Sequence, residues 1–574
     1  MASELSTSTP VAKPKLHGRA FYESIGSPKY VVAPMVNQSE FAWRMLTRSF
    51  MTPDENAKLL AYSPMYHARL FQETAKYRGV HFQATKKPID PPPTELSAPA
   101  AKEDLFLDGN PQFDRPLFVQ FCANDPAQLL RAAQIAAPYC DAVDLNLGCP
   151  QGIARNGHYG AFLQEDQKLV YDLINTLHRN LSIPVTAKIR ILDTKEDTLA
   201  YAKNVLAAGA SILTVHGRRR EQKGHLTGVA DWEYLRYLRE NLPKETVIFA
   251  NGNILQTGDL EKCLDATGAD AIMSAEGNLS DPAIFATAPP VGEEGREYWR
   301  GRNGKGGFRV DAVFRRYLDI LHKYVLQQEP PTRRPLFVVG DDEAWLSGAQ
   351  AKQQDEEGPA KKKRKKEGGK HESSPNLIAV RPHLFHLLRH FVARHTDIRD
   401  VLARTHSGDV PGIEKVLDLV ERRIAQGLID YEKTDGKSIE EEESIPTKVN
   451  NLPKPLAETE TKFEEVDPED DPESSVATVK ACKRPWWIAQ PIIRPLPKEA
   501  LAKGSIKLSK KERLKQEQEQ EQEQEQEGMD KDNGDGKKRK AEDELPRPDG
   551  VDGIKEPKMD TKNPGLTSEE LVCG

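Results

Sequence analysis

The sequence contains no run of about 20 apolar residues, the length that a membrane-spanning helix requires. Hydrophobic residues make up 38% of the 574 residues, aromatic residues 7% and charged residues 29%. This is a low apolar content for a single packed globule. The N-terminus also lacks the apolar core of a secretory signal peptide. These shortages predict a soluble intracellular protein in which folded parts are joined to polar segments.

Cysteine is sparse, with six residues in the chain and no CxxC pair. Neither a disulfide scaffold nor a metal site is therefore indicated, and we expect reduced thiols. The motifs GxGxxG and GxxxxGK[ST] are absent as well, so the sequence shows no Rossmann dinucleotide site and no P-loop.

Polar segments of biased composition surround the parts with apolar patterning. Residues 85–112 are Pro-rich, residues 328–375 contain the basic run KKKRKK, and the chain beyond residue 431 is acidic with Glu-Gln repeats. Such compositions cannot bury enough surface to offset the entropy of ordering. We expect residues 1–24 to be flexible, 85–112 to form an inserted loop, 328–375 to be a disordered insertion, and most of 431–574 to be a disordered tail.

Between residues 30 and 290, short apolar runs alternate with longer segments of helical pattern. Each run is apolar nearly throughout, which is typical of parallel strands that are covered on both faces. The cap Asn124-Asp125-Pro126 places a helix start between two of them. The eight runs are 30–33, 59–62, 117–121, 142–147, 185–189, 212–215, 247–250 and 271–273. This rhythm predicts an α/β fold, a (β/α)₈ TIM barrel over residues 25–300, with an open doubly wound sheet as the alternative.

Amphipathic helices follow the predicted barrel. In residues 311–325, one helical face carries Phe314, Tyr317, Leu318, Leu321 and Val325. Two more helices are expected in residues 377–405 and 411–426. The sequence therefore predicts a small all-α domain, built from residues 308–327 and 376–430, after the barrel.

Polar or Gly-containing clusters stand at the carboxyl ends of the predicted strands, where TIM-barrel enzymes build their active sites. The clusters are Pro34-Met35-Val36, Ser63-Pro64-Met65, Gln120, Asn146 to Pro150, Lys188 to Arg190, His216 to Arg218, Asn251-Gly252-Asn253 and Ala275-Glu276-Gly277. The last two suit a phosphate-bearing cofactor, because glycines let backbone N–H groups approach an anion. Lys188 and His216 could donate to an electron-rich ring or a phosphate, and Gln120 could bond a ring amide. The alternatives are an ion pair for the lysine and a core position for the histidine.

Cys149, in the sequence NLGCP, is the strongest single candidate for a catalytic residue. A thiol with a pKa of about 8.5 is mostly protonated at neutral pH and would serve as a general acid. A nucleophilic role would need a neighbouring base, and a buried inert thiol is the third possibility. Cys122 has no comparable context, so we assign it to the core.

A series of motifs, in one order, points to a known family. The motifs are APMVNQSEFAWR, AYSPMYHARLF, FVQFCANDP, DAVDLNLGCPQGIARNGHYGAFL, TAKIR, TVHGR, FANGNI and MSAEGNLSDPAIF. They resemble the tRNA-dihydrouridine synthases, and most of all the eukaryotic branch that modifies positions 16 and 17 of the tRNA D-loop. The segment RPHLFHLLRHFVARHTDIRDVL resembles the family's C-terminal helical domain. One departure from the bacterial members is Ala275-Glu276-Gly277, where those have a Gly-Arg pair.

The resemblance implies an FMN-dependent oxidoreductase that reduces the 5,6 double bond of uridine in tRNA with NADPH or NADH. The flavin would give a hydride to C6 of a flipped uracil while Cys149 protonates C5. The loop 157–160 would close over the base, and Lys188 would favour the anionic reduced flavin. The FMN-binding residues implied by the family are Pro34, Met35, Val36, Gln120, Lys188, His216, Asn251, Gly252, Asn253, Ala275 and Glu276.

RNA has to be held mainly through its phosphates. Arg190 and Arg218, with Arg219 and Arg220, flank the predicted barrel mouth. A second basic set, on the helical segment 381–394, comprises Arg381, His383, His386, Arg389, His390 and Arg394. A solvated basic helix is the alternative for this second set. The expected partner is tRNA, with mRNA left open, and the expected state is a monomer.

The tails suggest where the protein resides. The basic runs at 361–366 and 537–540 resemble nuclear localisation signals, so we expect nuclear residence, cytoplasmic residence or both. The aromatic cluster Trp486-Trp487 is expected to pack on the folded part rather than on RNA. Two other functions stay open from the sequence: an FMN barrel that reduces a free pyrimidine or enone, and a non-catalytic tRNA-binding protein.

Overall fold

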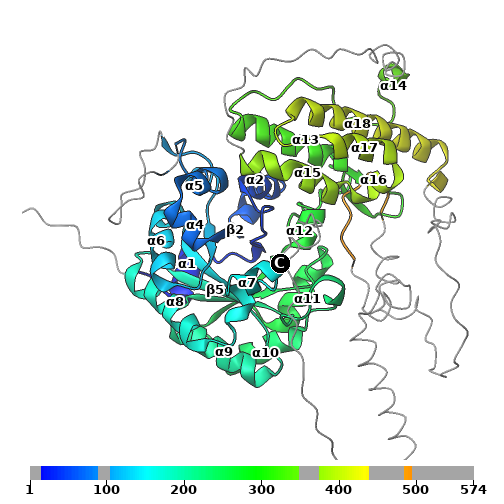
Figure 1. Cartoon of the computed structure of the whole chain (residues 1–574). Helices are drawn as coiled ribbons and strands as arrows, with labels where there is room; N and C mark the ends of the chain where they lie inside the picture. The colour runs from blue at the N-terminus through cyan, green and yellow to red at the C-terminus, as the bar shows by residue number, and fades with distance from the viewer. Residues whose placement is uncertain (1–14, 88, 90–103, 348–373, 439–483, 494–574) are drawn as a thin grey trace, which may run out of the picture. The chain divides into compact units, whose positions relative to one another are not determined.

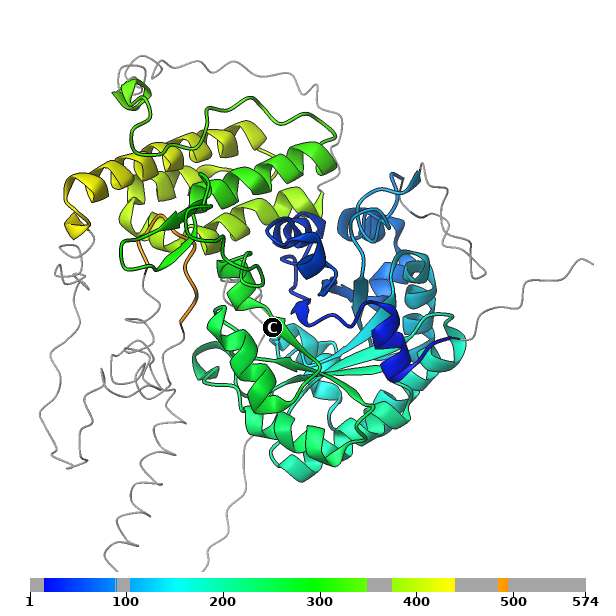
Figure 2. The same cartoon turned by 180° about the vertical axis from the view of Figure 1, so that it is seen from behind.

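The computed structural model describes residues 15–87, 89, 104–347, 374–438 and 484–493. Eight parallel strands close into a barrel in the order β1 to β8, and helices surround the ring (Figures 1 and 2). The closed barrel confirms the predicted (β/α)₈ fold and excludes the open sheet.

The strands agree closely with the predicted apolar runs. They are β1 (Tyr30–Val32), β2 (Leu59–His67), β3 (Leu117–Cys122), β4 (Ala142–Leu147), β5 (Val185–Arg190), β6 (Ile212–His216), β7 (Val247–Asn251) and β8 (Ala271–Ser274). Every residue of the strands β3 to β8 is buried, because side chains fill the barrel and helices cover its outside. Only β2 is much longer than predicted. A register shift between Tyr62 and Met65 lets this strand bend and continue.

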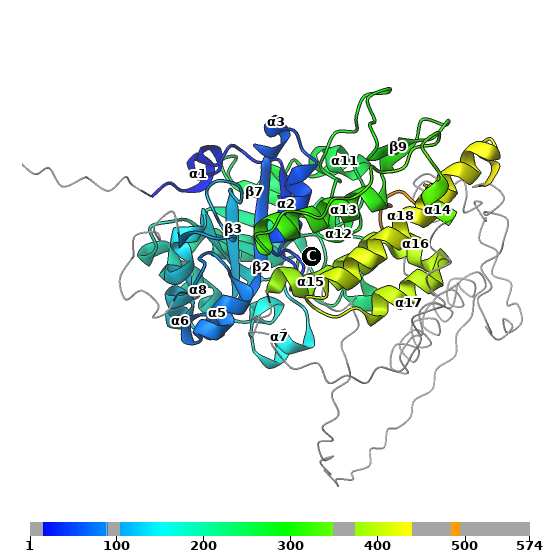
Figure 3. The same ribbon diagram turned by 90° about the horizontal axis from the view of Figure 1, so that it is seen from above.

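Helices lie between the strands, and several of them begin at side-chain caps. Asp125 accepts a hydrogen bond from the Gln128 N–H with Pro126 at the first position, as the sequence predicts. The helices of this part are α1 (Gly18–Ser24), α2 (Phe41–Ser49), α3 (Pro53–Asn56), α4 (Ala68–Glu73), α5 (Ala75–His81), α6 (Pro126–Ala136), α7 (Gly152–Asn156), α8 (Gln167–Asn180), α9 (Lys195–Ala207), α10 (Trp232–Asn241), α11 (Gly258–Thr267) and α12 (Glu276–Ser280). A 3₁₀ turn, η3 (Gly160–Leu163), separates α7 from α8. Figure 3 shows α7 projecting beyond the end of β2.

The C-terminal helices confirm one prediction and correct another. In α13 (Val310–Ile320) and the π-helical turn Leu321–Val325, the expected apolar face is buried except for Val325, which is half-buried. The single helix predicted over 377–405 is wrong, because the backbone leaves helical geometry at Leu388 and His395. The chain forms three helices instead, α15 (Pro375–Leu387), α16 (Arg389–Arg394) and α17 (Thr396–Arg404). Each of them contacts the next, and α17 contacts α18 (Val410–Lys433).

The helix predicted over 411–426 corresponds to α18, which is longer and extends past residue 431, where the disordered tail was expected to begin. A further short helix, α14 (Ala344–Ser347), lies within the predicted insertion.

A small antiparallel hairpin, β9 (Tyr298–Arg300) and β10 (Gly306–Phe308), was not predicted, since each strand has only three residues. Residues 484–493 lie against it. The Ala489 N–H donates to the Phe308 carbonyl and the Val310 N–H donates to the Trp487 carbonyl, both at 2.9 Å. Trp487 and Ile488 are buried. The expected packing of the aromatic cluster on the folded part is therefore confirmed.

Buried polar contacts join α2 to the C-terminal helices. His383 of α15 donates through Nε2 to the Glu40 carboxylate, 3.0 Å from Oε2, and its ring stacks on Trp43 at 3.9 Å between centroids. The Tyr317 hydroxyl donates to the same carboxylate at 3.2 Å. These contacts tie the loop after β1 to two helices that are distant in sequence.

Several sequence predictions fall outside the described residues: those for residues 1–14 and 90–103, both basic runs at 361–366 and 537–540, and most of the tail beyond 438. Among the described helices, none combines the length and the apolar character that crossing a bilayer demands.

Candidate active site

The loop after β4 carries Cys149, which is only 2% exposed. One side chain fixes its backbone: the Asn146 Oδ1 accepts hydrogen bonds from the Cys149 N–H at 2.9 Å and the Gly148 N–H at 3.1 Å. The Asn146 amide then donates to the Gln120 Oε1 at 2.9 Å. The position of the thiol is thus set by strand side chains inside the barrel rather than by a free loop.

The same network continues deeper into the barrel. The Gln120 Nε2 donates to Asp144 Oδ2 at 2.9 Å, and the Thr186 hydroxyl donates to Oδ1 at 2.6 Å. Burial raises the pKa of Asp144 to about 6, while the two hydrogen bonds and the charge of Lys188 oppose that rise. Asp144 and Asn146 lie two apart on β4 and so face the same side of the strand. Asn146 belongs to a predicted strand-end cluster, whereas Asp144 was not predicted. The signal that could have revealed Asp144 is polar residues at alternate positions of an apolar strand.

The turn after α7 lies directly against the cysteine. Gly160 has φ 65°, and a Cβ there would come within 2.8 Å of the Cys149 carbonyl oxygen, so only glycine fits. The Ala161 N–H donates to that carbonyl at 3.1 Å. The loop 157–160 therefore already borders Cys149, and its closing over a base stays a prediction.

The thiol of Cys149 belongs to a small buried cluster. Cys122, Ala154 and Tyr159 pack around it, with Val36, Met65 and Phe162 at the edge. Burial raises the pKa of Cys122, and the neighbouring Cys149 adds to the rise. Cys122 is buried, as predicted, but it also lies beside the candidate acid. All four cysteines within the described ranges are free thiols, and those ranges hold no cluster that could bind a metal.

A second linked group stands at the ends of β6 and β7. The Arg218 guanidinium lies 3.1 Å from His216 Nε2 and donates to the Asn253 Oδ1 at 2.6 Å. Gly252 and Asn253 both have left-handed backbone, with φ of 108° and 62°. An added Cβ at Gly252 would come within 3.0 Å of the His216 ring. Sequence reasoning assigned Arg218 to RNA, but the structure places it among the predicted cofactor residues.

Arg190 and Arg218 are both buried. The Arg190 Nε donates to the Gly148 carbonyl at 2.7 Å, and Arg218 donates to the Gly228 carbonyl. These guanidiniums are used inside the protein, which disfavours contact with RNA phosphates, and the RNA role of these two arginines stays a prediction. Arg190 supports the loop that carries Cys149.

The barrel brings the predicted cofactor residues to one end. Pro34, Met35 and Val36 follow β1, Gln120 and Lys188 lie on β3 and β5, and Ala275 and Glu276 start α12. Two observations fit a flavin there. Within the described residues, the buried Asn251 Oδ1 has no hydrogen-bond partner, and Lys188 is a buried cation, 2% exposed. A flavin ring offers an N–H donor for the first and acceptors for the second.

The basic helical segment divides into two sets. Arg381, Arg389 and Arg394 are exposed, whereas His383 is fully buried in its pair with Glu40. The guanidinium of Arg394 lies 5.5 Å from the centre of the Trp486 ring. The predicted RNA role of His383 is therefore wrong, and that of the three arginines stays a prediction.

Known proteins that are similar to this chain include enzymes with the activity that the sequence motifs imply. The family described as Dihydrouridine synthase (Dus) matches residues 31–305. A tRNA-dihydrouridine(16/17) synthase of Schizosaccharomyces pombe is 40% identical over 486 residues, which are 85% of this chain and 93% of that protein. A protein of the same name from Saccharomyces cerevisiae is 44% identical over 70% of this chain and 74% of its own. A mouse protein named as similar to these enzymes is 45% identical over 50% of this chain and 54% of its own. The chain belongs to the dihydrouridine synthase family, flavin-dependent oxidoreductases that reduce uridine to dihydrouridine in tRNA.

Proposed function

We propose that this dihydrouridine synthase uses FMN, takes its electrons from NADPH or NADH, and reduces uridines 16 and 17 of the tRNA D-loop. The names of the fungal relatives, which specify positions 16 and 17 and NAD(P)(+), support the choice of site and reductant. The observation that carries the chemistry is the pair of hydrogen bonds by which Asn146 holds the backbone of Cys149.

The residues of the chain divide the work between binding and proton transfer. Lys188, Asn251 and the Gly252-Asn253 turn would hold the flavin, which when bound supplies the hydride for C6 of uracil. Cys149 supplies the proton for C5, because a thiol is protonated at neutral pH and is a competent acid. A uracil can reach this buried thiol only after it leaves the RNA stack.

Orientation is the second contribution of the network. Inside the barrel, the Asn146 amide donates to Gln120, and the Gln120 amide donates in turn to Asp144. Such a chain of satisfied buried groups keeps the acid in one place without a rearrangement during the reaction.

The replacement Cys149→Ala tests the acid. We expect the variant to bind FMN and to oxidise NADPH, yet to form less than about one hundredth of the normal dihydrouridine, since general acids contribute about 10²–10⁴-fold. Flavin absorbance and mass spectrometry of digested tRNA measure the two halves separately. Cys140→Ala is the matched control, because Cys140 is equally buried but precedes β4 at the other end of the barrel. Normal product from Cys149→Ala would refute the acid role.

Family membership disfavours both alternative functions, reduction of a free pyrimidine and RNA binding without catalysis. Absence of dihydrouridine formation on free uridine, together with formation on tRNA, would complete that distinction. We further propose a monomer that resides in the nucleus, the cytoplasm or both. Activity on mRNA stays a prediction, to be tested by the same digestion assay.

A further inference from the structure

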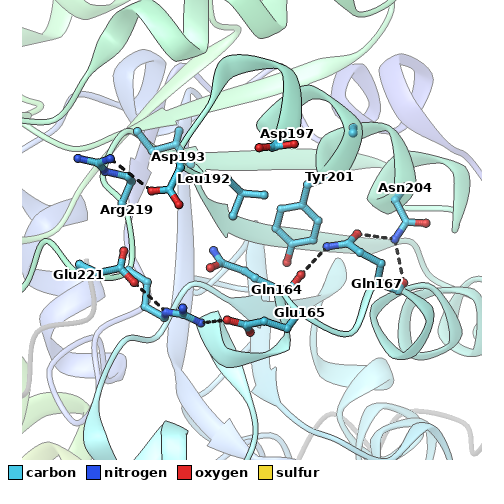
Figure 4. A pocket seen from close by; sticks show the side chains of 13 residues that line it. Gln164, Glu165, Gln167, Leu192, Asp193, Asp197, Tyr201, Asn204, Arg219 and Glu221 are labelled. Carbon is cyan, nitrogen blue, oxygen red and sulfur yellow. Dashed lines mark hydrogen bonds and ion pairs between the residues drawn. The ribbon is translucent and has the colours of Figure 1, made fainter. Parts of the chain in front are cut away.

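A cleft of about 530 Å³ lies beside the catalytic end of the barrel. Its walls come from one face of α9 and from three connecting segments: the turn between η3 and α8, the loop from β5 into α9, and the loop after β6 (Figure 4). All three segments follow the carboxyl ends of neighbouring strands, the end at which Cys149 stands. The volume is that of a typical small-molecule site and suits one nucleoside.

Two polar atoms of the residues that line this cleft are buried and lack a hydrogen-bond partner within the described part of the chain. Tyr201 of α9 is 1% exposed, and among the described residues its hydroxyl has no hydrogen-bond partner; the Gln164 Nε2 is likewise buried and without one. Figure 4 shows the Tyr201 hydroxyl directed toward the Gln164 side chain across the wall of the cleft. An unpartnered buried hydroxyl costs about 1–3 kcal/mol, and native proteins rarely keep one. These atoms indicate a ligand that completes their bonds.

The charges of the lining narrow the chemistry of that ligand. Four carboxylates, including Asp193 and Glu221, stand against two guanidiniums, those of Arg219 and Arg220. Arg219 pairs with Asp193 at 3.3 Å and Arg220 with Glu221 at 3.2 Å. This net negative lining repels a phosphate from the cleft. A neutral ring with both N–H donors and carbonyl acceptors suits it, because carboxylates accept from the former and Tyr201 and Gln164 donate to the latter.

One arginine connects the cleft with the catalytic turn. The Arg220 guanidinium borders the cleft, donates to the Ala161 carbonyl at 3.3 Å and lies 5.1 Å from the centre of the Phe162 ring. Ala161 in turn donates to the Cys149 carbonyl. The cleft is therefore separated from the candidate acid by a single turn of chain.

We propose that this cleft binds a nucleobase of the RNA substrate next to the uridine that is reduced, with Tyr201 and Gln164 as its hydrogen-bond partners. The proposal rests on the RNA substrate of the proposed function. The cleft would then contribute to the choice of site, since a hydrogen-bonding pocket discriminates strongly against a ring that lacks the matching groups.

Tyr201→Phe tests the proposal because it removes only the hydroxyl. In the full-length protein loaded with FMN, we expect the KM for tRNA to rise about tenfold, with kcat and the tRNA-free oxidation of NADPH unchanged. The melting temperature should rise rather than fall, because the variant no longer buries an unpartnered hydroxyl. Tyr237→Phe, which changes an exposed hydroxyl of α10, is the matched control and should alter none of these.

Measuring tRNA affinity in the Cys149→Ala background separates this test from the proposed function, since binding is then read without turnover. A weaker affinity for tRNA with Tyr201→Phe supports the cleft whatever the role of Cys149. Unchanged tRNA affinity and an unchanged KM for tRNA would overturn the proposal. The partner of the Tyr201 hydroxyl would then be a bound water molecule. A raised KM for NADPH in the absence of tRNA would also overturn it, by assigning the cleft to the nicotinamide.

Discussion

The catalytic end of the barrel and the C-terminal helices use polar residues in opposite ways. At the barrel end, Asp144, Gln120 and Asn146 are buried and bond one another. On the helices, Arg381, Arg389 and Arg394 are exposed, and the buried polar group His383 contacts another part of the chain. The barrel end is thus organised around a single thiol, whereas the helical segment combines an exposed basic face with an anchor.

This difference tells us how each region should respond to mutation. A buried network loses function when one member is removed, because its partners are left unsatisfied. An exposed basic face loses affinity gradually, because each phosphate contact adds a modest and salt-dependent amount. Four experiments test this contrast.

Asn146→Ala should lower the rate of dihydrouridine formation about 100-fold, because the Cys149 backbone loses its acceptor and a small misplacement of a reacting group is costly. Single-turnover measurements on tRNA, with reduction of the flavin by NADPH as the unaffected step, provide the test. Asn146→Asp keeps the acceptor but not the donor to Gln120, so its loss should be smaller. Equal losses in both variants would contradict the role assigned to the Oδ1 atom.

His383→Leu should destabilise the protein by about 3–5 kcal/mol, the usual cost when one partner of a buried pair is removed and the other stays behind. Here the remaining group is the Glu40 carboxylate. Denaturant unfolding measures the effect. His406→Leu replaces a histidine whose side chain is 81% exposed and should change little. If the two variants were equally stable, the anchor would have no energetic importance.

Stability should depend on pH through Asp144. Its pKa is about 6 in the folded protein and about 3.9 when unfolded, so between these values the native state keeps a proton that the unfolded state has lost. The stabilisation is present below pH 4 and is lost as the pH rises through 6, by up to about 3 kcal/mol. Unfolding of the wild type and Asp144→Asn at pH 4 to 7 should show this loss only in the former. If the wild type instead gained stability relative to Asp144→Asn between pH 4 and 7, the predicted direction of the pH dependence would be wrong.

The double variant Arg389→Gln, Arg394→Gln should bind tRNA about tenfold more weakly. The slope of log affinity against log salt concentration should fall by about 2. Both residues are exposed on α16. Arg131 and Lys203, exposed on α6 and α9, form a control pair of the same charge that should leave the slope unchanged. Unchanged binding in the first pair would move the RNA contact away from α16.

Much of the barrel end could be predicted because its signals are local. Apolar runs set the strands, and strand ends bring Gln120, Lys188 and Cys149 to one edge whatever the details of packing. What could not be predicted was burial. Arg190, Arg218 and His383 are basic residues in plausible RNA-facing stretches, but no local pattern shows that their side chains turn inward to carbonyls or to Glu40.

The sequence by itself determined the alternation of strands and helices, the places of the strands along the chain and the family resemblance, because these depend on periodicity and on short motifs at fixed places along the chain. Tertiary structure decided which polar residues meet. Asn146 meets Gln120 of the neighbouring strand, the turn at Gly160 lies against Cys149, and Tyr201 carries an unpartnered hydroxyl, among the described residues, where α9 and three loops form the cleft. Hydrogen bonds depend on distances between segments that are remote in sequence, and only the folded chain sets those distances.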